Sequence, residues 1–268
     1  MTWMRQIAYH QGMTTARAQP QFGAIAPEAA GMPLYRAVKR ALLRAIEDGN
    51  CPPGRALPAE AGLAAAFGVS VGTLRRATEE LVAEHILVRR QGLGTFVATH
   101  DADRFLFQFF HVEGSDGVRA APSVEFISFE RERADDEAAQ MLRLRAGEPV
   151  LVIENRLLLQ GKAVIHDRLA VSPLLFKGLT EKRFRERPST IYQLYQAGFG
   201  ITVVRAVERA RAALVDRRTS RILGLAPGSP VIQVRRTALT FGDKPVEYRV
   251  SVIDTGRHDY VNQLSRPT

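Results

Sequence analysis

The stretch FGVSVGTLRRATEELVAEHILVRRQGLGTFV, residues 67–97, decides the fold of the front of this chain. Gly68 is placed to end one helix in the left-handed conformation, and Ser70 is placed to cap the next helix. Apolar residues recur at helical spacing from Leu74 to Leu81, which predicts a helix there. The runs ILV and TFV then flank QGLG, a pattern typical of a two-stranded hairpin with a tight turn.

Two further helices precede this stretch. Pro33 stands at the favoured first position of a helix that carries an apolar stripe and that Gly49 ends. A short alanine-rich helix lies between the turn-rich segment CPPGRALP and Gly68. Three helices followed by a hairpin are the order of a winged helix-turn-helix, so residues 33–97 are expected to form such a domain.

Composition indicates a globular protein with a polyanionic partner. The chain has 268 residues, 46% of them apolar, and a net charge of +9 with a sequence pI of about 10.2. The single cysteine, Cys51, excludes an internal disulfide and fits the cytoplasm, and no apolar run predicts a membrane span. Residues 1–32 lack periodicity and are expected to be a disordered N-terminal extension, unless Met13 or Met32 is the true start.

The sequence changes character behind a mostly polar linker expected at residues 98–104. Residues 105–268 are rich in strands with helical stretches between them, which predicts an antiparallel α+β domain. Within it, the segment from Ala146 (AGEPVLVIENRLLLQGKAVIHDRLAVS) parallels the segment from Pro227 (PGSPVIQVRRTALTFGDKPVEYRVSVI). Each is a glycine turn, a strand, a tight turn and a strand. The two units are expected to pair into one sheet with pseudo-two-fold symmetry and to share a ligand cleft.

The third helix and the hairpin carry side chains suited to DNA. The second helix of a helix-turn-helix lies in the major groove, and arginine can donate two hydrogen bonds to guanine. A hydroxyl at a helix start suits phosphate, and a glycine-rich wing with arginines suits the minor groove. An alternative is that these charges form a solvated helix face. The residues expected to contact DNA are Arg36, Glu60, Ser70, Thr73, Arg75, Arg76, Arg89, Arg90, Gln91 and Gly92.

These segments resemble a known family. PLYRAVKRALLRAIEDG, PPGRALPAE, LAAAFGVS, TLRRATEEL and LVRRQGLGTFV are similar to the DNA-binding domain of GntR-family bacterial transcription regulators. ADDEAAQMLRLRAGEPV, STIYQLYQAGFG, LGLAPGSPV and GDKPVEYRVSV resemble the UTRA effector-binding domain of that family's HutC subfamily. The resemblance implies an antiparallel fold like that of chorismate lyase, a homodimer on a pseudo-palindromic operator, and a repressor whose DNA affinity a small molecule changes.

The chain departs from the family pattern at two base-reading positions. The family usually has Ser-Glu-Arg after the loop proline, where this chain has Ala59, Glu60 and Ala61. The family usually places Arg directly after the cap Ser70, where this chain has Val71. We therefore expect a half-site different from the family's common operator, with heavier reliance on phosphate and wing contacts.

Candidate effector-binding residues lie on the two hairpins of the repeat. With a two-residue turn at Gln160–Gly161, Arg156 is expected opposite Ile165 and Glu154 opposite Asp167, all on one face. In the second hairpin, Arg236 and Glu247 are expected on one face, with Tyr248 on the other. A surface salt-bridge cluster is the alternative. The residues expected to bind the effector are Glu154, Arg156, Asp167, Arg205, Glu247 and Tyr248.

The sequence contains no motif that indicates catalysis. It has no nucleophile elbow, no phosphate-binding glycine loop and no metal-ligand spacing among its histidines, so neither an enzyme nor a cofactor or metal is expected. The leading hypothesis is a ligand-responsive repressor. An architectural DNA-binding protein with an inert dimerisation domain, or a lyase-like enzyme tethered to DNA, is the alternative. Neither the effector nor the direction of its effect on DNA binding is fixed by the sequence.

Overall fold

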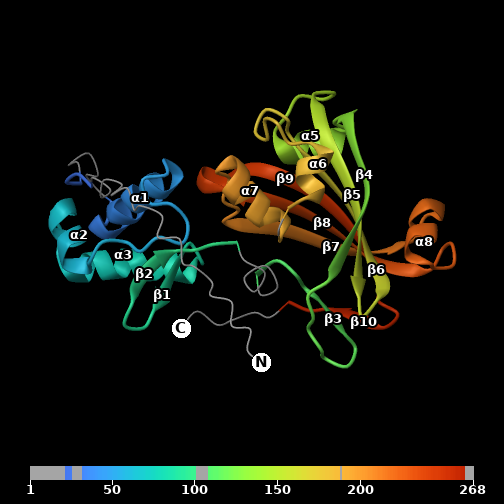
Figure 1. Ribbon diagram of the computed structural model, residues 1–268, viewed down its shortest axis with the longest axis horizontal. Helices are drawn as coiled ribbons and strands as arrows, with labels where there is room; N and C mark the ends of the chain where they lie inside the picture. The colour runs from blue at the N-terminus through green and yellow to red at the C-terminus, as the bar shows by residue number, and fades with distance from the viewer. Residues whose placement is uncertain (1–21, 26–31, 101–107, 188, 263–268) are drawn as a thin grey trace, which may run out of the picture.

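The computed structural model describes residues 22–25, 32–100, 108–187 and 189–262. A winged-helix domain lies at one end and a larger sheet domain at the other (Figure 1). Most of the expected extension 1–32 and linker 98–104 falls outside the described residues. In the described part of the extension, the Phe22 ring lies 5.2 Å from the Phe67 ring, and the Ile25 N–H donates to the Phe67 carbonyl over 3.2 Å.

The winged-helix domain has the predicted element order. It consists of α1 (Leu34–Glu47), α2 (Glu60–Phe67), α3 (Val71–Ala83) and the hairpin of β1 (Leu87–Arg90) and β2 (Gly94–Val97). Gly68 ends α2 with φ 68°, and the Ser70 side chain caps α3, as the sequence predicts. One apolar face from each helix and the hairpin ends form a common core, with Leu42, Leu74 and Leu81 fully buried.

The sheet domain confirms the predicted repeat. Its strands are β4 (Ser123–Arg133), β5 (Pro149–Leu159), β6 (Lys162–Val171), β7 (Arg205–Leu214), β8 (Pro230–Thr240) and β9 (Lys244–Ile253). They form one antiparallel sheet in the order β4-β5-β6-β9-β8-β7. Each half is therefore a strand, a helix and a hairpin, and the two halves meet where β6 pairs with β9.

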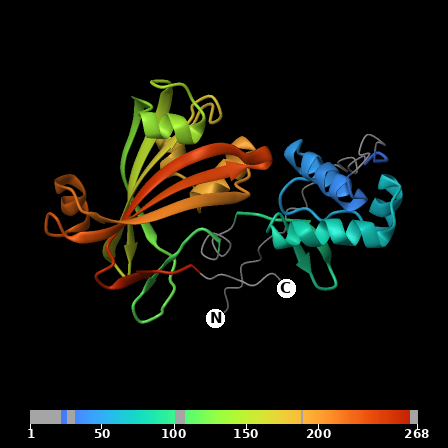
Figure 2. The ribbon, with the colours of Figure 1, turned by 180° about the vertical axis from the view of Figure 1, so that it is seen from behind.

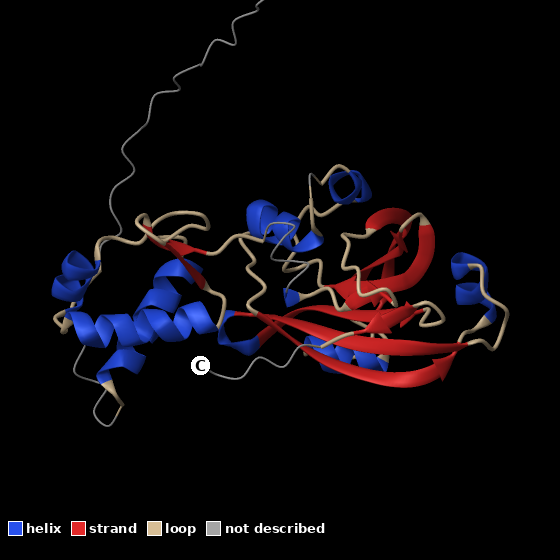
Figure 3. Ribbon diagram, turned by 90° about the horizontal axis from the view of Figure 1, so that it is seen from below, coloured by secondary structure: helices blue, strands red, loops and turns tan. Residues whose placement is uncertain are grey.

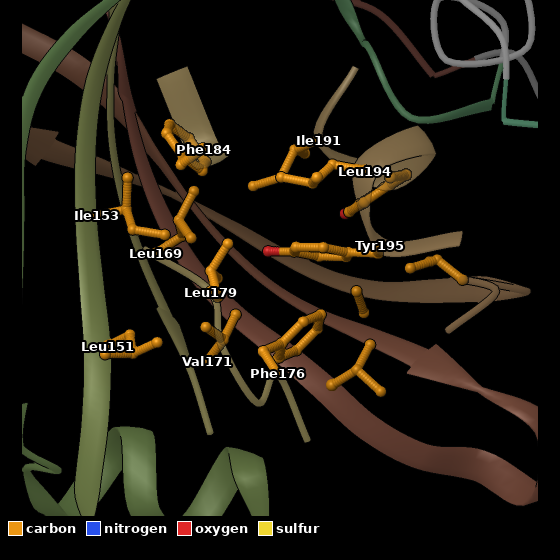
Figure 4. Close-up of a cluster of buried hydrophobic side chains, with 14 of the residues drawn as sticks. Leu151, Ile153, Leu169, Val171, Phe176, Leu179, Phe184, Ile191, Leu194 and Tyr195 are labelled. Carbon is orange, nitrogen blue, oxygen red and sulfur yellow. The ribbon is translucent and has the colours of Figure 1, made fainter. Parts of the chain in front are cut away.

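Helices cover both faces of this sheet. On one face, α5 (Asp136–Leu142) lies against β9 and α8 (Arg217–Leu223) against β6, so each repeat's helix contacts the last strand of the other repeat. On the opposite face lie α6 (Glu181–Arg185) and α7 (Ile191–Phe199), which the views from behind and below also show (Figures 2 and 3). Phe184 of α6, Tyr195 of α7 and Phe176 pack on Ile153 and Leu169 of the sheet (Figure 4).

The predicted register of the first hairpin is wrong by one residue. The two-residue turn is present, with Gln160 at φ 49° and Gly161 at φ 76°. A bulge at Val164, however, gives β6 one extra residue, so that Arg156 faces His166 and Glu154 faces Arg168. Side chains alternate along a strand, and the slip therefore places Glu154 and Asp167 on opposite faces of the sheet.

The second hairpin has the predicted arrangement. Arg236 pairs with Arg249 and Ala238 with Glu247, which places Arg236 and Glu247 on one face. Tyr248 pairs with Thr237 and lies on the other face, packed in the apolar cluster beneath α5. The face of Glu247 is the one that α6 and α7 cover.

The sequence did not predict the five-residue helix α6 or the pair of short strands β3 (Val112–Gly114) and β10 (His258–Tyr260). The carbonyl of His111 accepts the Val261 N–H over 2.7 Å, which extends this pairing and ties the end of the chain to the start of the sheet domain.

Candidate DNA interface and effector site

The start of α3 presents backbone N–H groups and two hydroxyls at the surface. The Ser70 Oγ accepts the Thr73 N–H over 3.1 Å and lies 2.9 Å from the Thr73 Oγ1. Val71 instead packs partly buried against the core of the domain. Its apolar side chain therefore stabilises the domain at the position where the family usually places an arginine.

Glu60 connects two of the predicted DNA-contacting arginines. Its carboxylate accepts from the Arg75 Nε over 2.7 Å and lies 3.9 Å from an Arg89 nitrogen. Arg75 belongs to α3 and Arg89 to the wing, and both remain exposed. One carboxylate at the start of α2 thus orients a recognition-helix arginine and a wing arginine relative to each other.

Three further arginines predicted to contact DNA lie against two aromatic rings. The Arg76 guanidinium stacks 4.1 Å from the centre of the Tyr35 ring, and the Arg36 Nε donates to the Tyr35 hydroxyl over 3.1 Å. In the wing, Arg90 lies 4.8 Å over the Phe96 ring. Gln91 and Gly92, the latter at φ 72°, form the exposed turn. Stacking holds these guanidinium groups in place while their edges stay exposed.

The centre of the sheet domain holds a carboxylate that is withdrawn from solvent. Glu247 is 0% exposed and accepts hydrogen bonds from Tyr195 over 2.8 Å, Tyr192 over 3.3 Å and the Arg249 Nε over 3.0 Å. Burial, followed by the nearby Glu247 charge, raises the pKa of Tyr192 to about 12. Burial and the same charge also raise the pKa of Tyr195. Both tyrosines therefore remain protonated donors at neutral pH.

Arg249 joins this carboxylate to a second one. Its Nη1 donates to Asp167 over 3.0 Å, and the Ser251 hydroxyl donates to the same carboxylate over 2.5 Å. Although burial opposes its charge, the attraction of Glu247 and Asp167 raises the pKa of Arg249. One guanidinium thus bridges β6 and β9, the two central strands, at the junction of the repeats.

A cavity of about 270 Å³ opens beside this ion pair. Its floor is the sheet, and its walls are the segment between α6 and α7 and the segment that leads into β4. The lining residues are Ala121, Pro122, Val124, Asn155, Leu157, Asp167, Leu169, Phe184, Arg187, Ser189, Thr190, Ile191 and Arg249. Apolar walls with a few converging polar groups are typical of a small-molecule site.

Two of the lining side chains have polar atoms without a partner among the described residues. The Asn155 Oδ1 accepts no hydrogen bond, and the Arg187 Nε donates none. Arg187 donates through its Nη1 to the Phe184 carbonyl over 2.7 Å but makes no ion pair with a described carboxylate. Burial lowers the pKa of Arg187, which means that its charge is only partly compensated in the protein. The cavity therefore offers an anion a partner.

The structure divides the predicted effector-binding residues. It places Asp167 and Glu247 in one cluster, with Asp167 lining the cavity. Glu154 lies on the opposite face, 2.6 Å from Arg218 of α8. The other three also lie apart from the cavity: Arg156 on Glu125, Arg205 on Asp243, and Tyr248 beneath α5.

Several groups at this site were not among the residues predicted to bind the effector. Arg249 stands two residues after Glu247 on the same strand, so strict alternation was a signal that it shares the same face. Asn155 was missed because the bulge shifts the register of β5 and β6 by one residue. Asn155 therefore lies opposite Asp167, on the face that the unbulged register gives to its neighbours. Arg187 follows α6 in an irregular segment without periodicity, and no local pattern pointed to it.

The chain matches two family models and several known proteins. Residues 34–97 match the model for bacterial regulatory proteins of the gntR family, and residues 118–259 match the UTRA domain. The histidine utilization repressor of Pseudomonas putida is 30% identical over 241 residues, which cover 87% of this chain and 93% of that protein. The transcriptional repressor NagR of Bacillus subtilis is 27% identical over 240 residues, covering 88% and 96%.

A solved structure gives the same result for the sheet domain. The ligand-binding domain of a protein assigned to the GntR-family transcriptional regulators, from Bordetella bronchiseptica, is 31% identical with a TM-score of 0.55. It covers 59% of this chain and 98% of that one. A winged helix joined to such a sheet domain defines a class of DNA-binding transcription regulators. The chain belongs to the gntR family of bacterial regulatory proteins, in the HutC subfamily, as the sequence resemblance predicts.

No helix among the described residues is long and apolar enough to cross a membrane. They also bring together no group of three or more His, Cys, Asp or Glu side chains that could hold a metal ion.

Proposed function

We propose that this protein is a transcriptional repressor that acts in the cytoplasm as a homodimer and loses its pseudo-palindromic operator when a small molecule binds the sheet domain. Relatives across nearly the whole chain are named as repressors, which supports this function. The exposed arginines of α3 and the wing supply the DNA contacts. In a dimer, two such domains lie about one DNA turn apart, as paired half-sites require.

Arg187 in the cavity wall, which makes no ion pair with a described carboxylate, is the observation that carries the choice of effector. A half-buried cation that lacks an ionic partner is poorly compensated, and an anionic ligand relieves that cost. The Asn155 Oδ1 on the cavity floor adds a demand for a hydrogen-bond donor. We therefore propose a small organic anion that carries an N–H or O–H donor. Because one relative is named for histidine utilization, histidine and compounds of its catabolism are the first ligands to test.

A thermal-shift screen of small organic acids tests this site. A ligand present at about 100 times its Kd should stabilise the protein by ~2.7 kcal/mol. The variant Arg187→Gln should lose that stabilisation, whereas Arg185→Gln, two residues away and outside the cavity lining, should keep it. If a ligand stabilises both variants equally, Arg187 does not bind it.

A mobility-shift titration then tests the direction of the response. Addition of the stabilising ligand should release operator DNA from the wild-type protein and leave Arg187→Gln bound. Tighter DNA binding would reverse the proposed sign. If no acid in the screen stabilises the sheet domain, the result favours an architectural DNA-binding protein with an inert dimerisation domain.

A further inference from the structure

The turn between β8 and β9 differs from its counterpart in the first repeat. The turn between β5 and β6 consists of two exposed residues, Gln160 and Gly161. The second turn has three residues, Phe241–Asp243, and its Phe241 side chain is only 8% exposed. Gly242 and Asp243 both have positive φ, at 65° and 55°, which turns Phe241 away from its own sheet. We call residues 240–244 the docking turn.

Phe241 packs into the winged-helix domain. It belongs to the buried cluster formed by α1, α2, α3 and the wing, and Val204, just before β7, packs against the same cluster. Lys244, at the end of the turn, lies 3.5 Å from Glu47 at the end of α1. Both views show this tip of the sheet beside α1 (Figures 1 and 2). The sheet domain thus contributes an aromatic ring to the core of the other domain.

The turn is also held from within the sheet domain. The Arg205 guanidinium donates to the Asp243 carboxylate over 2.9 Å, and the Val204 N–H donates to the Leu239 carbonyl over 2.9 Å. These bonds fix the direction in which Phe241 projects. Arg205, a predicted effector-binding residue, therefore has a structural partner at the domain boundary.

We propose that the docking turn is an interdomain contact that holds the winged-helix domain in one orientation, with Phe241 as its anchor. The same strand continues from the turn to Glu247 and Arg249, so a change at the ion-pair cluster beside the cavity reaches the turn through β9. The contact positions the winged-helix domain without covering it, since Arg75, Arg89 and Arg90 stay exposed. Only the regulatory consequence rests on the proposed repressor function.

A second connection runs from the same cluster through α7. Tyr195 of α7 donates to Glu247, and its neighbour Gln196 donates to the Ala98 carbonyl over 3.3 Å and accepts the His100 N–H over 3.1 Å. Ala98 and His100 follow the wing directly. The strand after the docking turn and the helix that holds the exit from the wing therefore meet at one buried carboxylate.

The variant Phe241→Ser tests the contact in full-length protein without DNA or effector. We expect faster amide hydrogen exchange in α1 and a larger radius of gyration in solution scattering. Leu214→Ser is the matched control, because it removes an apolar side chain that is 73% exposed at the end of β7. Phe241→Leu, which keeps an apolar side chain, should give a smaller effect and remains informative if the serine variant unfolds the winged-helix domain.

Operator binding supplies the functional readout. Suppose that Phe241→Ser lowers the fraction of dimers with both winged-helix domains docked to about a tenth. The apparent Kd for a full operator should then rise about tenfold, while the Kd for a single half-site stays unchanged. Exchange and scattering identical to wild type would overturn the docking contact, whatever the DNA result. A changed exchange pattern in protein that binds no operator in any form would overturn the repressor function and leave the contact standing.

Discussion

At the residue scale, Glu247 and Glu125 show how differently two ion pairs depend on burial. Glu247 is withdrawn from solvent and held by Arg249 and two tyrosines, whereas Glu125 pairs with Arg156 at the surface, with side chains 47% and 41% exposed. Water screens the surface pair, and the buried pair has no such compensation if one partner is lost. The first pair is therefore expected to matter for stability and the second is not.

The variant Glu247→Gln keeps the size of the side chain but removes the charge that Arg249 faces. Loss of one partner from a buried pair costs about 3 kcal/mol, so the free energy of unfolding of the sheet domain in urea should fall by that order. Glu125→Gln is the control and should change it by less than about 1 kcal/mol. Equal losses in the two variants would show that the Glu247 charge contributes nothing specific.

At the scale of elements, local signals predicted where helices end but not how strands align. Gly68 and Ser70 act through their own backbone and side chain, so the sequence alone places the boundary between α2 and α3. The bulge at Val164 depends on how β6 pairs with β5 and on the hydrogen bond from the Asp254 N–H to the Val164 carbonyl. No residue near Val164 indicates that long-range contact in the sequence. The register was therefore predicted wrongly, and the residues of the predicted site lie on two faces of the sheet.

The cap of α3 allows stability and DNA binding to be separated. Ser70→Ala removes the acceptor for the Thr73 N–H and should destabilise the winged-helix domain by ~1 kcal/mol. Ser70→Asp keeps an acceptor, so thermal unfolding of that domain should stay near wild type. If α3 meets phosphate, as the sequence predicts, both variants bind operator more weakly, since alanine lacks the hydroxyl that donates to phosphate and aspartate repels phosphate. Full DNA affinity in Ser70→Asp would place the start of α3 away from the DNA backbone.

At the scale of the whole molecule, the pseudo-symmetry of the sheet places the ion-pair cluster at its centre, on the strand that continues from the docking turn. Two similar hairpins meet at β6 and β9, where Arg249 bridges Asp167 and Glu247. Of the two hairpin turns, the one between β8 and β9 contacts α1, because the turn between β5 and β6 lies at the opposite end of the antiparallel pair β6 and β9. The repeat was evident in the sequence, but this asymmetry was not, because the partner of Phe241 lies in the other domain.

A fixed orientation of the winged-helix domains has a consequence for operator geometry. In the proposed dimer, each domain is held by its docking turn, so the two half-sites must lie on one side of the DNA. Inserting five base pairs between the half-sites rotates one of them by about half a turn, given 10–10.5 base pairs per turn, and should abolish full-site binding by wild-type protein. In Phe241→Ser the domains are free to reorient, and the insertion should weaken binding far less. Mobility-shift titrations with matched operators give both values. Equal sensitivity of the two proteins to the insertion would mean that spacing is set by the dimer interface instead of the docking turn.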